Sequence, residues 1–456
     1  MPQTYKNYTF GGNMRYRLAV FAGKLTILIL KMLGRKASTN PGVVAIKICP
    51  DVLKIMAKKL DGDIIAVLGT NGKTTTNNML ADYLEAGGKR TVSNRVGANM
   101  KTGVTTAFLN KANWFGKLNA DVATLEMDEA WAKHIFPDVQ PTKVVINNLF
   151  RDQLDRYGDI ESTMEHLKKA ISLVPHATLI ANGDDPLVFE TVRNFPNKKR
   201  FYGIKDKFLN SSDNVKEGKY CYSCGEKLKY NFIHFSQLGD YACTCGFKRP
   251  PLTYSAKEIR VFPSVSFDVD GFGEINLNGR GVYNIYNVLG AMAGAVECGV
   301  PFEAIENCAK NYKPQIGRME HFSINGKDVY LVLAKNPAGF NQSVNTALED
   351  PRQKDVILAV NDAVEDGQDV SWLWDVNFDA LLEDKSILSY TVSGARYGDL
   401  ALRLKYSGVD QKDISLFAEI KNAIDYALCG KGDALYLLVN YTVLFSAQAY
   451  LKEKEQ

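Results

Sequence analysis

At 456 residues with 46% hydrophobic content, the chain is long enough to bury several cores, and two to four domains are expected. Eight cysteines in so long a chain are too few for a disulfide scaffold, so we expect reduced thiols and a cytoplasmic protein. The net charge of +4 is too small to indicate nucleic-acid binding by itself.

The first 60 residues are strongly basic. They carry eleven Lys and Arg residues against Asp51 alone, a net charge of +10, so the other 396 residues sum to −6. Residues 18–34 are apolar, but Lys24 and Lys31 interrupt them and the run is shorter than the roughly 20 residues of a bilayer span. No cleavage site follows, which argues against a signal peptide. We expect residues 1–60 to be a helical region packed on the central domain, with its lysines pointing outward. Peripheral contact with anionic lipid is the alternative.

The stretch IIAVLGTNGKTTTNNML (64–80) has the pattern of a phosphate-binding loop between a strand and a helix. Backbone N–H groups and the helix N-terminus would bind phosphate, while Lys73 reaches the outer phosphates and the Thr74 hydroxyl binds Mg²⁺. Val67 stands where the general pattern has glycine, so this is not the common form of the loop. The predicted ATP-binding residues are Gly69, Thr70, Asn71, Gly72, Lys73, Thr74 and Thr75.

Further apolar runs at 122–127, 143–148 and 177–182 alternate with helix-period segments. Such continuous apolar runs are typical of a parallel sheet covered by helices on both faces. Glu126 lies at the end of the first of these runs, at the sheet edge where ligands bind, so it is predicted as the second Mg²⁺ ligand. Alternatively, Glu126 or Asp128 only caps the following helix.

Residues 205–255 interrupt the alternation and contain two cysteine pairs. Cys221 and Cys224 have the usual zinc-ribbon spacing, whereas Cys243 and Cys245 are one residue closer. Four thiolates on two tight turns suit tetrahedral Zn²⁺. We predict a structural zinc ribbon, because the insertion is too small to build its own core. A redox pair or unliganded thiols are the alternatives.

Beyond a run at 261–269 and a helix that ends at Gly299, a second alternation begins. Strands are expected at 328–336, 355–361, 386–394 and 434–442. The sequence therefore predicts an α/β fold in three parts. These are the N-terminal region 1–60, a central ATP-binding domain 61–317 with the insertion 205–255, and a smaller C-terminal α/β domain 318–456.

Several motifs, in their order along the chain, resemble the Mur ligase family: GTNGKTT, NNLFRDQLDRYGD (147–159), NIYN (284–287) and GRMEHF (317–322). The resemblance runs over most of residues 61–456. Enzymes of this family form an acyl phosphate from a carboxylate and ATP, and an amine then displaces the phosphate. The resemblance is closer to one branch, the MurT-type subunits of lipid II isoglutaminyl synthase. It rests on SNRVGANM (93–100), the cysteine insertion, AKNPAGFNQ (334–342) and NDAVEDGQDVSWLWD (361–375).

The resemblance implies ATP-dependent amidation of the D-glutamate α-carboxylate of the peptidoglycan precursor lipid II, giving D-isoglutamine. A GatD-type glutaminase partner would supply the ammonia. Cys298 and Cys429 lack the preceding glycine of a glutaminase nucleophile, so we do not expect this chain to make its own. A lipid-linked substrate would bring the enzyme to the inner face of the membrane.

Roles for individual residues also follow from the resemblance. Arg318 would meet the ATP phosphates, Asn284 and Asn287 would lie on the purine side, and Asp369 would assist the attack of ammonia. Other members have a metal-binding His in the run that here reads DQLD (152–155), so the resemblance does not imply a second metal site of the usual form.

Less specific interpretations stay open. Arg318 could form an ordinary surface salt bridge, Asn284 could cap a helix, and the acidic loop with Asp369 could simply be solvated. For the whole chain, one alternative is a Mur-type or polyglutamate ligase that adds an amino acid. The other is a nucleotide-gated module that binds nucleic acid through its zinc ribbon.

Overall fold

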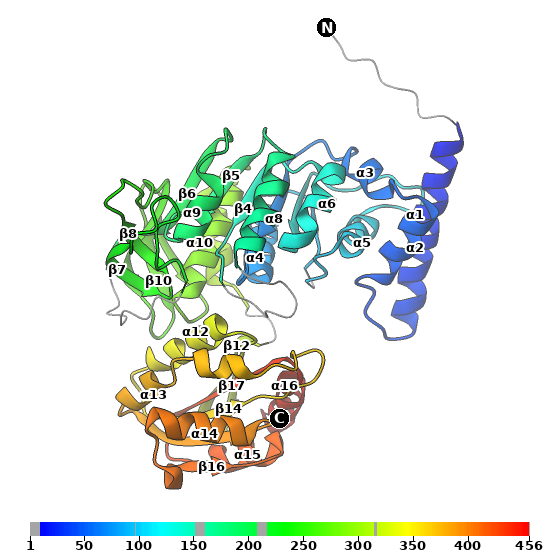
Figure 1. The fold of residues 1–456 in the computed structure, drawn as a ribbon. Helices are drawn as coiled ribbons and strands as arrows, with labels where there is room; N and C mark the ends of the chain where they lie inside the picture. The colour runs from blue at the N-terminus through cyan, green and yellow to red at the C-terminus, as the bar shows by residue number, and fades with distance from the viewer. Residues whose placement is uncertain (1–9, 96, 151–159, 208–216, 314–316, 456) are drawn as a thin grey trace.

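The computed structural model describes residues 10–95, 97–150, 160–207, 217–313 and 317–455. Figure 1 shows two α/β bodies, one above the other, with three N-terminal helices at one edge of the upper body.

The upper body is built on a nine-stranded sheet with the order β11-β10-β9-β6-β5-β4-β1-β3-β2. The strands are β1 Ile64–Leu68, β2 Thr91–Ser93, β3 Val122–Glu126, β4 Lys143–Ile146, β5 Thr178–Asn182, β6 Lys199–Ile204, β9 Tyr254–Arg260, β10 Val265–Val269 and β11 Gly273–Leu277. Strand β1 lies inside the sheet, between β4 and β3, and is buried along its whole length, which explains its continuous apolar run.

The sheet is mixed, whereas the sequence indicated a parallel one. Neighbours from β2 to β9 pair in parallel, but β10 pairs antiparallel with both β9 and β11. Only residues 261–264 and 270–272 join these three strands. Such short connections permit hairpins and exclude a crossover helix, so this edge is antiparallel.

Helices cover both faces of the sheet and bury a separate core on each. One face carries α4 Lys73–Ala86, α10 Tyr283–Val296 and α11 Phe302–Lys310. The other carries α5 Lys101–Lys111, α6 Glu129–Val139, α8 Ile160–Ser172, α9 Pro186–Val192 and the N-terminal helices. Between β6 and β9, a hairpin of β7 Lys229–Phe235 and β8 Leu238–Ala242 lies at the far end of the body from those helices (Figure 1).

The N-terminal helices are α1 Phe10–Met32, α2 Asn40–Ile48 and α3 Val52–Ala57. They pack on α5 and α6, and α1 contributes Tyr16, Val20 and Ile27 to the core. Among the helices described, none combines the length and apolar composition that a membrane crossing requires. Lys24 does not point outward as expected: its ammonium donates to Leu109 O at 3.2 Å and to Ala112 O.

The lower body is a six-stranded sheet with the order β12-β13-β17-β14-β15-β16. The strands are β12 Arg318–Ile324, β13 Lys327–Leu333, β14 Lys354–Ala359, β15 Ile387–Ser393, β16 Ile414–Leu416 and β17 Ala434–Val439. All pairs are parallel except β12 with β13. The principal helices are α12 Pro337–Leu348, α14 Tyr397–Ser407, α15 Ile420–Leu428 and α16 Tyr441–Glu455, with short helices η1 Ser371–Asp375, α13 Asp379–Glu383 and η2 Gln411–Asp413.

A polar cluster, here called the clasp, joins the two bodies. Arg280 of the upper body lies 2.9 Å from the Asp350 carboxylate and donates to the Tyr436 hydroxyl at 2.6 Å. Tyr436 and Arg352 also donate to Asp350, at 2.8 and 2.7 Å. Asp350 is buried, and Arg352 and Tyr436 of its own body already bind it. Arg280 therefore adds a contact across the boundary to a carboxylate that the lower body holds in place.

Candidate active site

A cleft of about 640 Å³ lies between the two bodies, within the size range of small-molecule sites. The upper body lines it with the phosphate-binding loop and the start of α6. The lower body lines it with the following residues: Arg318, Val332, Leu333, Ala334, Lys335, Asn336, Gly339, Gln342, Ser343, Glu365 and Tyr441. The cleft therefore requires both domains.

The loop conformation depends on its glycines. Gly69 and Gly72 have φ values of +123° and +80°, which favour glycine. A Cβ at Gly72 would lie 2.2 Å from Asn287 Oδ1, and one at Gly69 would lie 2.9 Å from Asn148 N. Asn148 also supports the loop directly, because its carbonyl accepts from Thr70 N and its side chain from Asn71 N, both at 2.8 Å. The start of α4 is thereby presented to the cleft, where its N-terminal potential suits phosphate.

Glu129 is paired with the loop lysine, a contact that the sequence did not reveal. Its Oε1 lies 2.9 Å from Lys73 Nζ and accepts from Gly69 N at 2.8 Å. Lys73 also donates to the carbonyl oxygens of Gly69 and Thr70. Glu129 is buried at the first turn of α6, and burial raises the pKa of its carboxyl. A carboxylate thus occupies the donors that phosphate would use.

Thr74 and Glu126 converge on one spot beside Gly97. A Cβ at Gly97 would lie 3.6 Å from Thr74 Oγ1 and 3.7 Å from Glu126 Oε2. Glu126 Oε2 is buried and has no hydrogen-bond partner among the residues described. A hydroxyl and an unsatisfied carboxylate oxygen beside open space are a suitable donor set for Mg²⁺. The capping alternative applies to Asp128, which accepts from Ala130 N and Trp131 N at the start of α6.

Not all of the residues expected around the nucleotide line the cleft. Arg318 begins β12 and lines the cleft from the opposite side, and Asn287 of α10 lines it beside the loop. Asn284 does not line the cleft. Its amide donates to Arg280 O at 2.7 Å and its oxygen accepts from Asn287 at 3.1 Å, so it supports Asn287 from one turn away.

Of the acidic loop after β14, only Glu365 lines the cleft. Asp369 is exposed, and its carboxylate accepts from Ser371 N at 2.8 Å. Hydrogen bonds from the Ser371 side chain and backbone lower the pKa of Asp369. Asp362 pairs with Arg396 at 2.9 Å, and buried Asp366 accepts from Thr442 N. Glu365 therefore joins Asp369 as a candidate proton acceptor. The DQLD run lies outside the described residues.

Gln342 of α12 is a further residue that the sequence did not single out individually. It lines the cleft, and its buried Nε2 has no partner among the described residues. Asn71 Nδ2, in the loop opposite, is equally unsatisfied within the described part of the chain. Buried donors on both walls of a cleft indicate that a polar ligand would satisfy them.

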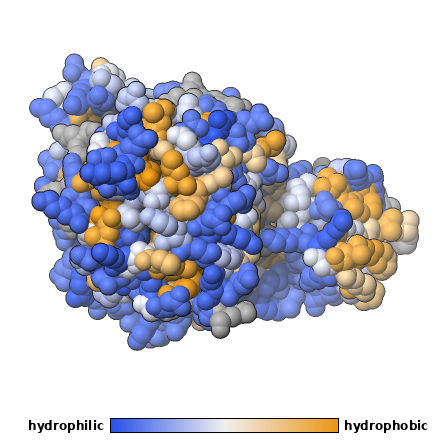
Figure 2. Space-filling view, turned by 90° about the horizontal axis from the view of Figure 1, so that it is seen from below, coloured by the Kyte–Doolittle hydropathy of each residue, from blue (hydrophilic) through white to orange (hydrophobic). Residues whose placement is uncertain are grey.

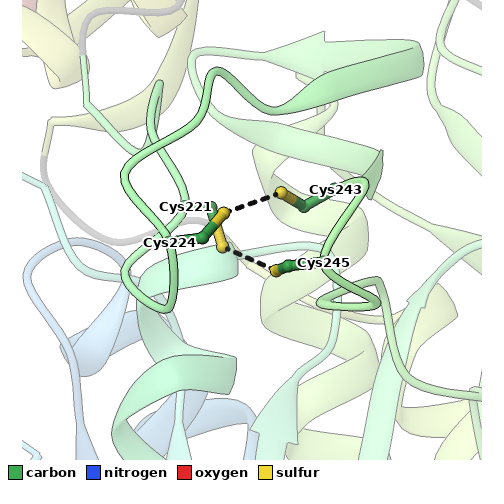
Figure 3. A group of neighbouring side chains, drawn as sticks. All are labelled: Cys221, Cys224, Cys243 and Cys245. Carbon is green, nitrogen blue, oxygen red and sulfur yellow. Dashed lines mark hydrogen bonds between the residues drawn. The ribbon is translucent and has the colours of Figure 1, made fainter.

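The four clustered cysteines converge as a metal site requires (Figure 3). Their sulfur atoms lie within 4.8 Å of one another, with 3.6 Å between Cys221 and Cys245 and 3.4 Å between Cys224 and Cys243. Tetrahedral Zn²⁺ with Zn–S bonds of about 2.3 Å would place sulfurs roughly 3.8 Å apart.

The shorter Cys-x-Cys spacing is compatible with this geometry. Gly225 and Gly246 each follow the second cysteine of a pair and have positive φ, so both turns fold back in the same way. Zn²⁺ therefore fits the four residues present. None of them lines the cleft, which favours a structural role for a bound metal.

Comparison with known proteins gives two family matches. A model of the Mur ligase middle domain matches residues 67–295, and a model of the MurT ligase C-terminal domain matches residues 333–444. The chain is 34% identical to the lipid II isoglutaminyl synthase (glutamine-hydrolyzing) subunit MurT of Staphylococcus aureus strain N315, over 87% of this chain and 89% of the relative. It is 33% identical to the protein of that name from Streptococcus pneumoniae strain R6, over 97% and 98%.

Solved structures share the fold at lower identity. A pseudomurein peptide ligase type C from Methanothermus fervidus superposes with a TM-score of 0.68 at 23% identity, over 88% of this chain and 80% of that one. A MurF ligase from Thermotoga maritima, solved in complex with ADP, superposes with a TM-score of 0.63 at 15% identity, over 90% and 84%. These likenesses concern the fold alone.

Proposed function

This chain belongs to the Mur ligase family, in its MurT branch, and we propose that it is the ATP-dependent synthase subunit of a lipid II isoglutaminyl synthase. The reaction proposed is amidation of the D-glutamate α-carboxylate of lipid II to D-isoglutamine. The observation that carries the proposal is the identity to MurT proteins over nearly the whole chain, together with a cleft lined by the phosphate-binding loop and by the MurT-type C-terminal domain.

In this proposal the first step is phosphoryl transfer. The loop amides, the α4 N-terminus and Lys73 bind the ATP phosphates, and Arg318 adds positive charge from the other domain. A carboxylate oxygen of the substrate attacks the γ-phosphorus, ADP leaves, and an acyl phosphate results. Mg²⁺ bound by Thr74 and Glu126 would neutralise charge on the phosphates.

Ammonia then attacks the acyl carbon, loses a proton, and displaces inorganic phosphate. We propose Asp369 as the group that orients ammonia or accepts this proton, with Glu365 as the alternative because it lines the cleft. The ammonia comes from a GatD-type glutaminase in a heterodimer or larger complex. The name of the relatives, a glutamine-hydrolyzing synthase subunit, supports such a partner.

The substrate also sets the place of action. Lipid II carries its peptide on a membrane-embedded lipid, so the proposed enzyme works at the inner face of the membrane. The zinc ribbon, in this proposal, stabilises the insertion after β6 and takes no part in the chemistry.

The test is mass spectrometry of lipid II after incubation with ATP, glutamine and a glutaminase partner. Conversion of one carboxylate to an amide replaces a hydroxyl by an amino group and lowers the mass accordingly. Free ammonium salts should support the same conversion without the partner. Incorporation of an amino acid from a panel would show an amino-acid-adding ligase instead. ATP turnover that depends on nucleic acid and on no carboxylate substrate would favour the binding module.

A further inference from the structure

Helix α1 has a second apolar face, which is largely exposed to solvent. Its core-facing positions are Tyr16, Ala19, Val20, Gly23 and Ile27. Apolar side chains also recur every three or four residues on the opposite side, where they are exposed. This outer face consists of Met14, Leu18, Phe21, Leu25, Leu28, Ile29 and Met32. Figure 2 shows hydrophobic residues gathered at the end of the molecule where the N-terminal helices lie.

A turn that follows α5 extends the outer face with two aromatic residues. Trp114 packs on Phe21 of α1, with ring centroids 5.6 Å apart. Phe115, at the tip of the turn, is 78% exposed. The turn is held firmly, since Gly116 O accepts from the Tyr16 hydroxyl at 2.7 Å and from Lys59 at 3.1 Å. The aromatic side chains are therefore presented on a fixed support.

The charge around the outer face has one sign. Residues 10–50 contain no Asp or Glu. Arg17 and Lys31 of α1 are exposed, and so are Arg35 and Lys36, which follow the helix. An apolar helix face bordered by Lys and Arg, with Trp and Phe beside it, is the pattern of helices that lie in a membrane interface.

We propose that the outer face of α1, together with Trp114 and Phe115, inserts into the headgroup region of an anionic lipid bilayer. A second copy of this chain is disfavoured as occupant, because it would bring the same basic residues against one another. Anionic lipid complements them, and the exposed aliphatic and aromatic side chains leave water. The helix lies along the surface, about 35 Å in length at 1.5 Å per residue for its 23 residues.

This inference extends the proposed function, because a lipid-linked substrate would be reached from the bilayer surface. It differs from attraction by charge alone: the apolar residues should contribute as much as the basic ones. The test contains no lipid II and no ATP. Its failure would therefore leave the amidation proposal standing.

The experiment is flotation of the full chain with vesicles of phosphatidylcholine and phosphatidylglycerol. We expect binding by the wild type and weaker binding by a variant with Leu18→Gln, Leu25→Gln and Phe115→Ser, by about tenfold or more. Leu402→Gln with Leu416→Gln removes equally exposed leucines from the lower body and is the matched control; it should bind as the wild type does.

A second variant removes charge at Arg17, Lys31 and Lys36 by substitution with Gln. It should also lose about tenfold or more, because each basic residue near an anionic surface adds to the attraction, and binding should fall when phosphatidylglycerol is omitted. Melting curves that match the wild type exclude misfolding. The proposal is overturned if the apolar variant floats as the wild type does. It is equally overturned if wild type stays with the unbound protein, or if the outer face mediates a concentration-dependent dimer without lipid binding.

Discussion

Glu129→Gln should tighten ATP binding, because Glu129 places a negative charge where phosphate must approach. Its Oε1 lies 2.9 Å from Lys73 Nζ, so a phosphate oxygen at a similar distance beyond the ammonium is at most about 6 Å from the carboxylate. Two unit charges at that separation repel by about 3 kcal/mol at an effective dielectric constant of about 20. Mg²⁺ and water screen part of this repulsion. We therefore expect ATP to bind at least about tenfold more tightly, or about 1.4 kcal/mol.

The free protein should be destabilised by the same change, since the partly buried Lys73 loses the charge of Glu129 beside it. Calorimetric titration with ATP and Mg²⁺ measures the affinity, and thermal melting with and without nucleotide measures the stability. Glu129→Asp is the control, because it keeps the charge while shortening the side chain; it should not tighten binding. Weaker ATP binding by Glu129→Gln would refute the reasoning and would show that the carboxylate assists the nucleotide.

Three further outcomes are expected. Asp369→Asn should leave ATP binding unchanged and lower amide formation by about 10²–10⁴ if Asp369 accepts the proton; loss only in Glu365→Gln would assign that role to the cleft residue. Cys224→Ser should reduce the zinc content measured by elemental analysis and lower the melting temperature, because three thiolates bind Zn²⁺ more weakly than four; a wild type without zinc would contradict the site. Burial raises the pKa of Glu349 from 4.5 to about 8, so the folded protein retains a proton that the unfolded chain releases. The stability of the wild type should therefore fall as pH rises between these values and level off above them. The melting temperature of Glu349→Gln should depend less on pH over the same range. If the melting temperatures of wild type and variant change with pH in parallel, this account is excluded.

Elements with a strong period or a continuous apolar run could be predicted from the sequence. The expected runs at 64–68, 122–127 and 143–148 correspond to β1, β3 and β4 within two residues. Strands β2 and β16 have only three residues each, too short for a period to show. Strand β12, RMEHFSI, was not among the expected strands: two consecutive polar residues, Glu320 and His321, interrupt its alternation of polar and apolar residues. Short or half-exposed edge strands depend on tertiary pairing that a single sequence does not encode locally.

The same limit applies to the site. The phosphate-binding loop with Thr74 follows from a local pattern, because one strand, one turn and one helix determine it. Glu126 was predicted from its place at the end of an apolar run, at the sheet edge where ligands bind. No local pattern indicates the role of Glu129. In the sequence it is only an acidic residue in the first turn of a helix, where such residues are common because they stabilise the helix. Its pairing with Lys73 exists only because β1 and β3 are neighbours in the sheet.

The cleft in which the proposed reaction takes place is formed by both domains. The loop belongs to the upper body, whereas Arg318, Gln342 and Glu365 belong to the lower one, so neither half of the cleft is sufficient alone. The clasp, in which Arg280 of the upper body and Arg352 of the lower body both bind the Asp350 carboxylate, holds the two halves together. Because Asp350 is buried and accepts from three side chains, removing Arg280 would leave it partly satisfied by Arg352 and Tyr436. The arrangement can therefore loosen without unfolding the lower body, which is the property that a cleft needs if substrate and nucleotide are to enter and products are to leave.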